Sequence, residues 1–184
     1  MPTVSELNGA TATTNSRYIN DPNLKPEKSW TTELTAEKDL GNALLRLTFF
    51  TENVHDSLYA QTNFDPAANS NISRVQNVAR IQTNGVELAL SGNDLIRKGL
   101  DLSGSVTYAD SRIKDNAGFV STPGDTIGKV QPRVPVWRAT ALASYRIDPQ
   151  WTTTFGIDNL NNYKYWNFHP YPQRSYAAEM RFDL

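Results

Sequence analysis

Apolar and polar residues alternate by twos through much of the sequence. The first such stretch has Trp30, Thr32, Leu34 and Ala36 at one parity, and Thr31, Glu33, Thr35 and Glu37 at the other. Because successive side chains of a β-strand point to opposite faces, this period predicts a strand with one mainly apolar and one polar face. An apolar strand face must be covered, either by a second layer of protein or by lipid.

The same alternation occurs in seven stretches, which are separated by turn or loop signals. They are residues 30–37, 43–52, 84–90, 100–109, 137–145, 151–157 and 176–184. Most approach the ~9–11 residues that a tilted membrane strand needs. We therefore predict an all-β fold, an antiparallel meander of about seven strands.

The connections between these stretches alternate between short and long. The short ones lie near Gly41, 92–99 and Pro149, and the long polar ones run over 56–74, 111–135 and 160–174. Residues 1–29 are polar, with two prolines within 21–27, and we expect them to form a loop. Short turns on one side of a sheet and long loops on the other are typical of a transmembrane β-barrel.

Large aromatic residues lie near the ends of the predicted strands, where amphipathic rings would meet a lipid interface. They are Trp30, Tyr108, Trp137, Tyr145 and Trp151. Two other folds remain open. A soluble β-sandwich also alternates by twos, although its apolar face must then meet a second sheet. A small autonomous outer-membrane barrel with a structural role is the other, and an odd number of strands argues against it.

Composition excludes several classes of protein. The 184 residues carry a net charge of −1, which gives no electrostatic case for binding nucleic acid. No apolar run approaches the ~20 residues of a membrane helix. The sequence has no cysteine, so disulfides, thiolate metal sites and a cysteine nucleophile are excluded. The first seven residues contain neither a basic nor an apolar segment, so no signal peptide is predicted.

The sequence offers little that could carry out catalysis. Its two histidines, His55 and His169, have no further ligand at metal-binding spacing. No serine, histidine and aspartate combine into a triad, and no glycine-rich phosphate loop is present. We predict no catalytic residue, no metal and no cofactor, and hence no enzyme. Glu33 and Glu37 share a strand face and are predicted to be solvated charges on the polar side.

Several segments together resemble the C-terminal part of TonB-dependent outer-membrane receptors. They are residues 2–7 (PTVSEL), 21–27 (DPNLKPE), 77–88 (NVARIQTNGVEL), 158–160 (DNL) with Tyr163, 172–175 (PQRS) and the final alternating strand. Each segment alone is weak, but their order and spacing cover nearly the whole chain.

This resemblance implies a transmembrane barrel of about 22 strands, filled by an N-terminal plug domain. Residues 1–184 would supply the C-terminal sector of about seven strands, with 1–29 as an extracellular loop. The signal peptide, the plug and the energy-coupling segment are then missing, so we expect a fragment that is inactive alone. Glu33 and Glu37 would face the lumen and pair with arginines of the plug.

The resemblance also implies a function and a set of partners. The whole receptor would import a ferric siderophore or a similar scarce solute across the outer membrane of a Gram-negative bacterium. Haem, cobalamin, copper chelates and glycans enter through related barrels. The expected partners are that solute, the lipid bilayer, the outer-membrane assembly machinery, and TonB with its inner-membrane energising complex, acting through the plug. A small soluble β-sheet domain with a binding role remains the alternative.

Two groups of site residues follow from the resemblance. Outer-loop aromatic and basic residues would contact the solute: Tyr165, Trp166, Phe168, His169, Tyr171 and Arg174. Packing in the loop, with Arg174 as its anchor, is the competing interpretation. The last strand would be read by the insertion machinery through Tyr176, Ala178, Met180, Phe182 and Leu184. This strand departs from the family pattern, in which an aromatic residue ends the chain.

Overall fold

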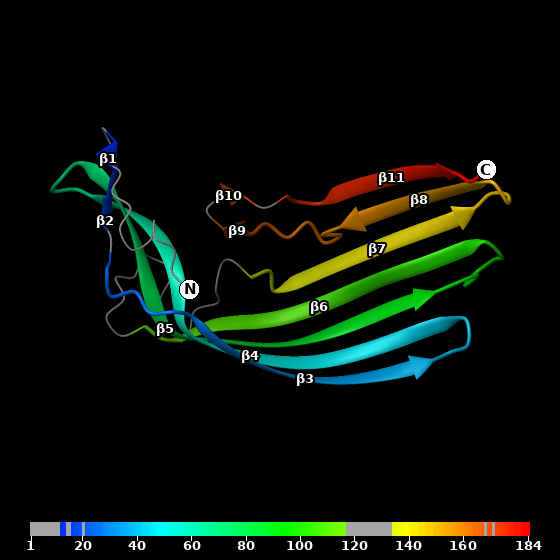
Figure 1. The fold of residues 1–184 in the computed structure, drawn as a ribbon, viewed down its shortest axis with the longest axis horizontal. Coiled ribbons are helices and arrows are strands. Elements are labelled where there is room, and N and C mark those ends of the chain that lie inside the picture. Colours follow the sequence, from blue (N-terminus) through cyan, green and yellow to red (C-terminus); the bar gives the residue numbers. More distant parts are fainter. Residues whose placement is uncertain (1–11, 14–15, 20, 117–133, 168, 171) are drawn as a thin grey trace. The chain divides into compact units, whose positions relative to one another are not determined.

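The computed structural model describes the chain except for residues 1–11, 14–15, 20, 117–133, 168 and 171 (Figure 1). No helix occurs among the described residues, and therefore none that is long and apolar enough to cross a membrane. The strands are β1 (Ala12–Thr13), β2 (Ser16–Ile19), β3 (Lys28–Asp39), β4 (Ala43–Asp65), β5 (Ser70–Gly92), β6 (Leu100–Asp115), β7 (Trp137–Arg146), β8 (Trp151–Asp158), β9 (Trp166–Asn167), β10 (His169–Pro170) and β11 (Ser175–Phe182). The prediction of an all-β chain is confirmed.

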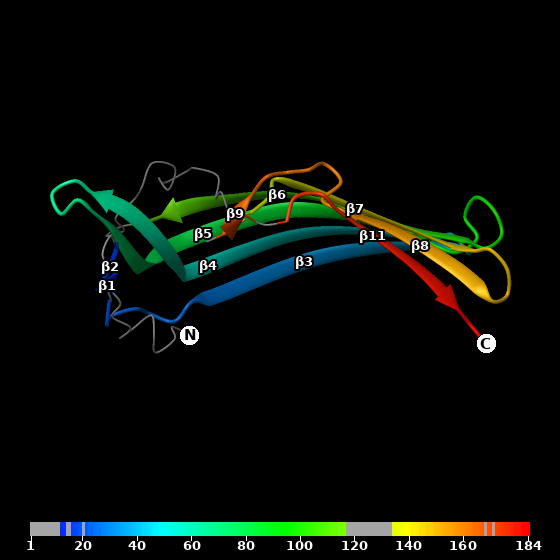
Figure 2. The same ribbon diagram turned by 90° about the horizontal axis from the view of Figure 1, so that it is seen from above.

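Seven long strands form one meander, in which β3 pairs with β4, β4 with β5, and the order continues through β6, β7 and β8 to β11. Figure 1 shows these strands side by side in this order, and Figure 2 shows β3 to β6 in the same order from above. β2 adds to β5 in parallel, β1 pairs with β2, and β9 and β10 form a separate pair. Each connection between consecutive strands of the meander leads to a neighbouring strand, so the predicted antiparallel meander is confirmed.

The register of the meander aligns the predicted faces. In the β6–β7 pair Tyr108 lies opposite Trp137, and in the β8–β11 pair Phe182 lies opposite Trp151. Side chains that are directly opposite in an antiparallel pair lie on the same face of the sheet. The apolar stripes of neighbouring strands therefore merge into one apolar face, and the polar stripes into one polar face.

The chain divides into two compact units. Unit 1 comprises Met1–Thr31, Glu52–Thr83 and Ser111–Gln131, and unit 2 comprises Thr32–Thr51, Asn84–Asp110 and Pro132–Leu184. In unit 2 the three predicted short turns are present. Two are closed by aspartates: Asp39 accepts a hydrogen bond from the Gly41 amide at 2.7 Å, and Asp148 accepts from Trp151 at 2.8 Å. Gly41, at φ +89°, has the left-handed backbone that glycine adopts without steric cost.

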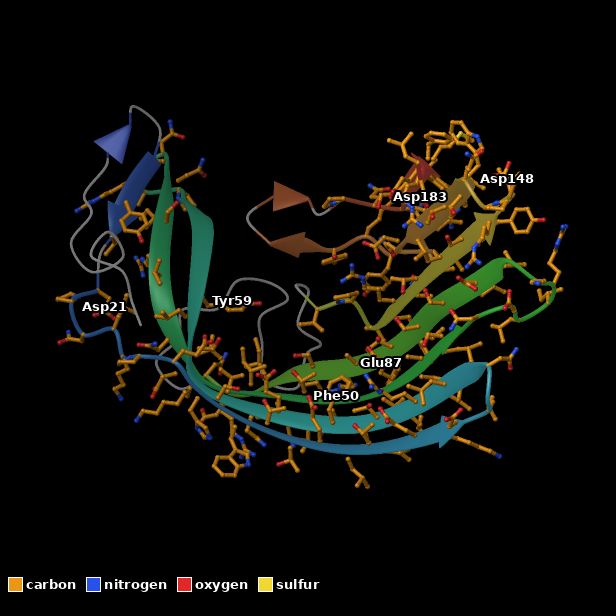
Figure 3. All side chains as sticks on the ribbon, turned by 45° about the vertical axis from the view of Figure 1, so that its right-hand side comes forward. Asp21, Phe50, Tyr59, Glu87, Asp148 and Asp183 are labelled. Atoms are coloured by element: carbon orange, nitrogen blue, oxygen red, sulfur yellow. The ribbon has the colours of Figure 1, made fainter. Side chains whose placement is uncertain are left out.

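Unit 1 has a small hydrophobic core of its own. Tyr59, Val78, Ile81 and Ile113 are buried together, and Val54 packs against them. Figure 3 shows Tyr59 on β4. Val78 and Ile113 have no exposed surface at all. The core lies in the parts of β4, β5 and β6 that belong to unit 1, whereas the sequence pattern gave no indication of a core.

The prediction of a long loop over residues 56–74 is wrong. β4 continues to Asp65 and β5 begins at Ser70, so only the turn 66–69 separates them, with Asn69 at φ +44°. β6 likewise continues to Asp115, β1 and β2 lie within the N-terminal segment predicted as loop, and β9 and β10 lie within 160–174. The polar composition of these segments hid the strands, because they lack a regular alternation of apolar and polar residues.

Candidate functional site

The apolar face of the unit 2 sheet is exposed over all its strands. Leu34 is 72% exposed and Met180 63%, and no layer of described residues covers them. Members with at least a third of their surface exposed are Leu34, Phe49, Leu88, Leu90, Val106, Trp137, Trp151, Phe155, Tyr176, Met180 and Phe182. Soluble monomers rarely expose a contiguous apolar surface of this kind, so the face requires a partner of its own polarity.

Aromatic contacts mark both ends of the apolar face. The rings of Tyr108 and Trp137 lie 4.8 Å apart at one end, and those of Trp151 and Phe182 lie 4.8 Å apart at the other. Along β7, eight residue steps separate Trp137 from Tyr145, which corresponds to about 26 Å of strand. At a strand tilt of ~40° this spans about 20 Å, close to the ~25 Å apolar band of outer-membrane barrels. Trp30, also predicted at an end, lies near the start of β3 and belongs to unit 1.

The polar face of the same sheet carries side-chain hydrogen bonds between neighbouring strands. The pairs are Thr35–Thr48, Thr107–Glu87, Ser105–Thr140 and Ser144–Thr154, at 2.8–3.1 Å. On the same face, Nη2 of Arg138, on β7, donates hydrogen bonds to both carboxylate oxygens of Asp158, at 2.8 and 3.0 Å. Side-chain hydrogen bonds thus connect neighbouring strands across the polar face.

The two glutamates predicted to face a lumen differ from each other. Glu37 accepts a hydrogen bond at 2.6 Å from Nε of Arg46, and so already has its arginine within the sheet. Pairing of Glu37 with an arginine of the plug stays a prediction. Glu33 lines a polar hollow with Glu87 and Phe50, and forms no ion pair with any residue that the structure describes.

Phe50 is an aromatic residue on the polar face that the sequence pattern left unexplained. Its ring lies over Gly85 of the neighbouring strand β5, and Figure 3 shows it near Glu87. A Cβ on residue 85 would touch this ring and come within 2.5 Å of the Tyr108 carbonyl oxygen. The glycine inside an alternating strand was the available signal, because such a glycine marks a close approach.

The segment after β8 forms a latch of hydrogen bonds at Asn159. This side chain is 2% exposed; its Oδ1 accepts from the Tyr163 amide and its Nδ2 donates to the Tyr163 carbonyl, both at 2.9 Å. Asn161 Nδ2 donates to the Trp137 carbonyl at 2.7 Å. Arg174 Nη2 donates to the Leu160 carbonyl at 2.6 Å. The latch therefore joins the end of β8 to the starts of β7 and β11.

The predicted solute-contacting residues are only partly brought together. Arg174 belongs to the latch. Tyr165 is half-buried and lies two residues after Tyr163, which also belongs to the latch. Trp166 lies on β9 and His169 on β10, strands that pair with each other. Phe168 and Tyr171 lie outside the described residues. The contact of this group with a solute stays a prediction, while the hydrogen bond of Arg174 is the kind that anchors a loop.

The final strand has the alternation expected of an insertion signal. Tyr176, Ala178, Met180 and Phe182 share one parity of β11 and oppose β8 residues on the apolar face. The strand ends at Phe182, and Leu184 follows it.

For a metal, the residues that the structure describes contain no group of three or more His, Asp or Glu that could hold an ion.

One family model and several solved structures are similar to this chain. The family model described as TonB dependent receptor-like, beta-barrel matches residues 1–178. The copper transporter OprC aligns with 98% of this chain and 35% of its own length, at 14% identity and a TM-score of 0.53. The closed form of the ferric-catecholate import receptor Fiu from E. coli K12 aligns with 95% of this chain and 30% of its own, at 16% identity and a TM-score of 0.49.

A further solved structure, the siderophore receptor PirA from Pseudomonas aeruginosa, aligns with 91% of this chain and 32% of its own length, at 18% identity and a TM-score of 0.46. The chain thus spans about a third of the length of each of these proteins. A search of curated proteins found no match. At such low identity the likeness to OprC concerns the fold alone, and it agrees with the predicted sector of a barrel wall.

Proposed function

The chain belongs to the family of TonB-dependent receptor β-barrels, and we propose that it is the C-terminal sector of a barrel that imports a scarce solute across the outer membrane. Members of this family are transporters rather than enzymes. The observation that carries the proposal is the two-faced single layer of unit 2. Its apolar face is exposed and bounded by aromatic pairs, while its polar face is laterally hydrogen-bonded.

The two faces have opposite requirements, and a barrel wall meets both. In hydrocarbon every backbone polar group must be paired within the protein, which a closed sheet achieves. The apolar face then contacts lipid, and the polar face lines a lumen filled by a plug domain. The turns 40–42, 93–99 and 147–150 would lie on the periplasmic side. The parts of β4 and β5 that belong to unit 1 form a hairpin that would lie outside the cell with residues 1–29.

The extracellular placement of this hairpin is supported by its own packing. A segment in water must bury its apolar side chains against one another, and Tyr59, Val78 and Ile113 do so. Asn77 adds a polar clamp: it accepts a hydrogen bond from the Lys25 amide at 2.7 Å and donates to the Asp56 carbonyl at 2.7 Å. This clamp holds the N-terminal segment against β4 and β5 within unit 1.

For the solute we propose a ferric siderophore or a similar chelate. Its contacts would come from the loop after the latch: Tyr165, Trp166, Phe168, His169, Tyr171 and Arg174. Flat aromatic rings and a guanidinium suit an anionic, aromatic metal chelate. The latch at Asn159 would hold both ends of this loop to the rim of the barrel.

The partners follow from the same proposal. TonB and its inner-membrane complex would act through the plug, and the assembly machinery would read the stripe of β11 that ends in Phe182 and Leu184. This chain would not transport alone, because the plug and the rest of the barrel wall are needed.

The test uses the natural polypeptide that contains this chain, in a bacterium that lacks its own siderophore receptors. We expect the polypeptide in the outer-membrane fraction, and growth on one ferric siderophore as the sole iron source that is lost when TonB is deleted. Arg174→Gln is expected to reduce uptake, with Arg181→Gln on β11 as a matched control. A polypeptide that stays soluble and monomeric without detergent would instead support the small soluble binding domain.

A further inference from the structure

The turn between β5 and β6 holds its shape through several backbone hydrogen bonds. The Leu95 amide donates to the Leu100 carbonyl and the Leu100 amide to the Arg97 carbonyl, both at 3.1 Å. The Gly99 carbonyl accepts from the amide of Arg146, on β7, at 2.8 Å. The turn is therefore fixed to a neighbouring strand, and the side chains that it presents have defined positions.

Asp94 of this turn and Asp101 at the start of β6 both accept hydrogen bonds from backbone amides of the turn. Asp94 Oδ1 accepts a hydrogen bond from the Gly99 amide, and Asp101 Oδ1 accepts from the Asp94 amide at 3.1 Å. Among the residues that the structure describes, neither carboxylate forms an ion pair with Arg97 or Lys98. The two acids thus serve the shape of the turn and leave the two cations unneutralised by direct contact.

Arg97 is held at the rim of the apolar face. Its guanidinium carbon lies 4.6 Å from the centre of the Tyr145 ring, and its Nη2 donates a hydrogen bond to the Tyr145 hydroxyl. Tyr145 is the last residue of the apolar stripe on β7. Ile96, beside Arg97, is 78% exposed, and Lys98 on the other side is exposed as well. A fixed cation, a second cation and an apolar side chain therefore meet where the apolar face ends.

We propose that this turn binds the headgroup of an anionic phospholipid in the membrane leaflet that the short turns meet. Arg97 and Lys98 would contact the phosphate, Tyr145 would orient Arg97, and Ile96 would enter the acyl region. The inference rests on the proposed function, because it requires the apolar face to contact lipid. The positive charge distinguishes this turn from the other two short turns, because the turns 40–42 and 147–150 contain no lysine or arginine.

The chemistry favours a lipid over free phosphate. Free phosphate has no apolar part that could contact the exposed Ile96 or the adjoining apolar face. The acyl chains of a phospholipid can contact both. Anionic lipids attract lysine and arginine at a membrane surface, and an arginine stacked on an aromatic ring presents its remaining N–H donors in a fixed direction.

The test titrates phosphatidylglycerol into the natural polypeptide, extracted in mild detergent, and counts bound lipid by native mass spectrometry. Phosphatidylcholine is the zwitterionic probe. We expect preference for phosphatidylglycerol, and Arg97→Gln to weaken its binding about fivefold. Tyr145→Phe keeps the ring but loses the hydroxyl, and should weaken binding about threefold. Arg97→Lys is expected to fall between the wild type and Arg97→Gln, since it keeps the charge and loses the planar stack.

Lys38→Gln, which removes a cation just before another short turn, is the matched control and should change nothing. Equal losses for Lys38→Gln and Arg97→Gln would show a general charge effect and overturn the site. Displacement of the lipid by millimolar inorganic phosphate would assign the site to phosphate alone and overturn the lipid. A polypeptide absent from the membrane fraction would refute the proposed function, whereas a membrane-inserted Arg97→Gln protein with unchanged lipid binding would refute only this inference.

Discussion

The two units of the chain treat their large apolar side chains in opposite ways. In unit 1 the described members are buried, as Val78 and Ile113 are, or half-buried, and among them Trp30 alone has a largely exposed surface. In unit 2 the buried hydrophobic residues are only alanines, Ala43 and Ala109, while the large ones are exposed or half-buried. Both units are made of β-strands, so secondary structure does not cause the difference.

The difference identifies the solvent for which each unit is built. Water drives apolar side chains together, whereas lipid leaves them free to face outward. A single strand, β4, contains both an exposed and a buried aromatic side chain. Phe49 is exposed in unit 2, and Tyr59, ten residues later, is buried in unit 1. Substitutions that distinguish the two solvents therefore test the comparison directly.

The largest effect is expected from a charge in the core of unit 1. Ile113→Asp places a carboxylate at a fully buried position without a partner, which costs about 4 kcal/mol or more. We expect hydrogen exchange to accelerate in β4, β5 and β6 within unit 1. Lys114→Asp introduces the same side chain at the exposed neighbouring position and should leave exchange unchanged. Equal protection in both variants would show that unit 1 has no cooperative core.

A charge at the centre of the apolar face of unit 2 comes next. Ala141 lies four residues from both Trp137 and Tyr145, so Ala141→Arg puts a cation at the bilayer midplane, at a cost of about 2–4 kcal/mol. Leu142→Arg is the matched control on the polar face, with an expected cost below about 1 kcal/mol. Urea unfolding in lipid vesicles measures both. Similar values for the two variants would mean that water covers both faces.

The meander was predictable because its strands follow a strict period of two. The faces, the short turns and the strand order of unit 2 all follow from that period and from the turn residues near Gly41 and Pro149. The core of unit 1 was not predictable in this way. Val78 and Ile81 are three residues apart, out of step with alternation, yet both are buried. Tyr59 lies in a stretch that is mostly polar, so this stretch of sequence was interpreted as loop.

The candidate site was predictable only where contacts are local. Glu37 and Arg46 flank one short turn on the same face, so their pairing follows from the hairpin register. Arg97 and Tyr145 are 48 residues apart, and only the folded sheet brings them together. The latch was visible as the DNL segment, but the role of Asn159 depends on its left-handed backbone, at φ +51°, and on its burial.

The polar clamp of unit 1 provides a smaller effect. Asn77→Ala removes the partner of the Lys25 amide and carbonyl and of the Asp56 carbonyl. Leaving such groups partly buried and unpaired costs about 1–3 kcal/mol. Limited proteolysis within 21–27 should speed up accordingly. Asn71→Ala, an exposed asparagine of the same strand, serves as the control, and equal cleavage rates would argue against a clamp.

The smallest effect is expected from an ion pair on the polar face of unit 2. Arg46 and Glu37 are 2.6 Å apart, but their side chains are 51% and 45% exposed, so water screens the attraction. Arg46→Gln should lower the free energy of unfolding by less than about 1 kcal/mol in vesicles, and less still at high salt. A double-mutant cycle with Glu37→Gln measures the coupling. A coupling above about 2 kcal/mol would mean that this part of the polar face is dry. The lumen there would then be filled by packed protein, and the polar face would share the burial that now distinguishes unit 1.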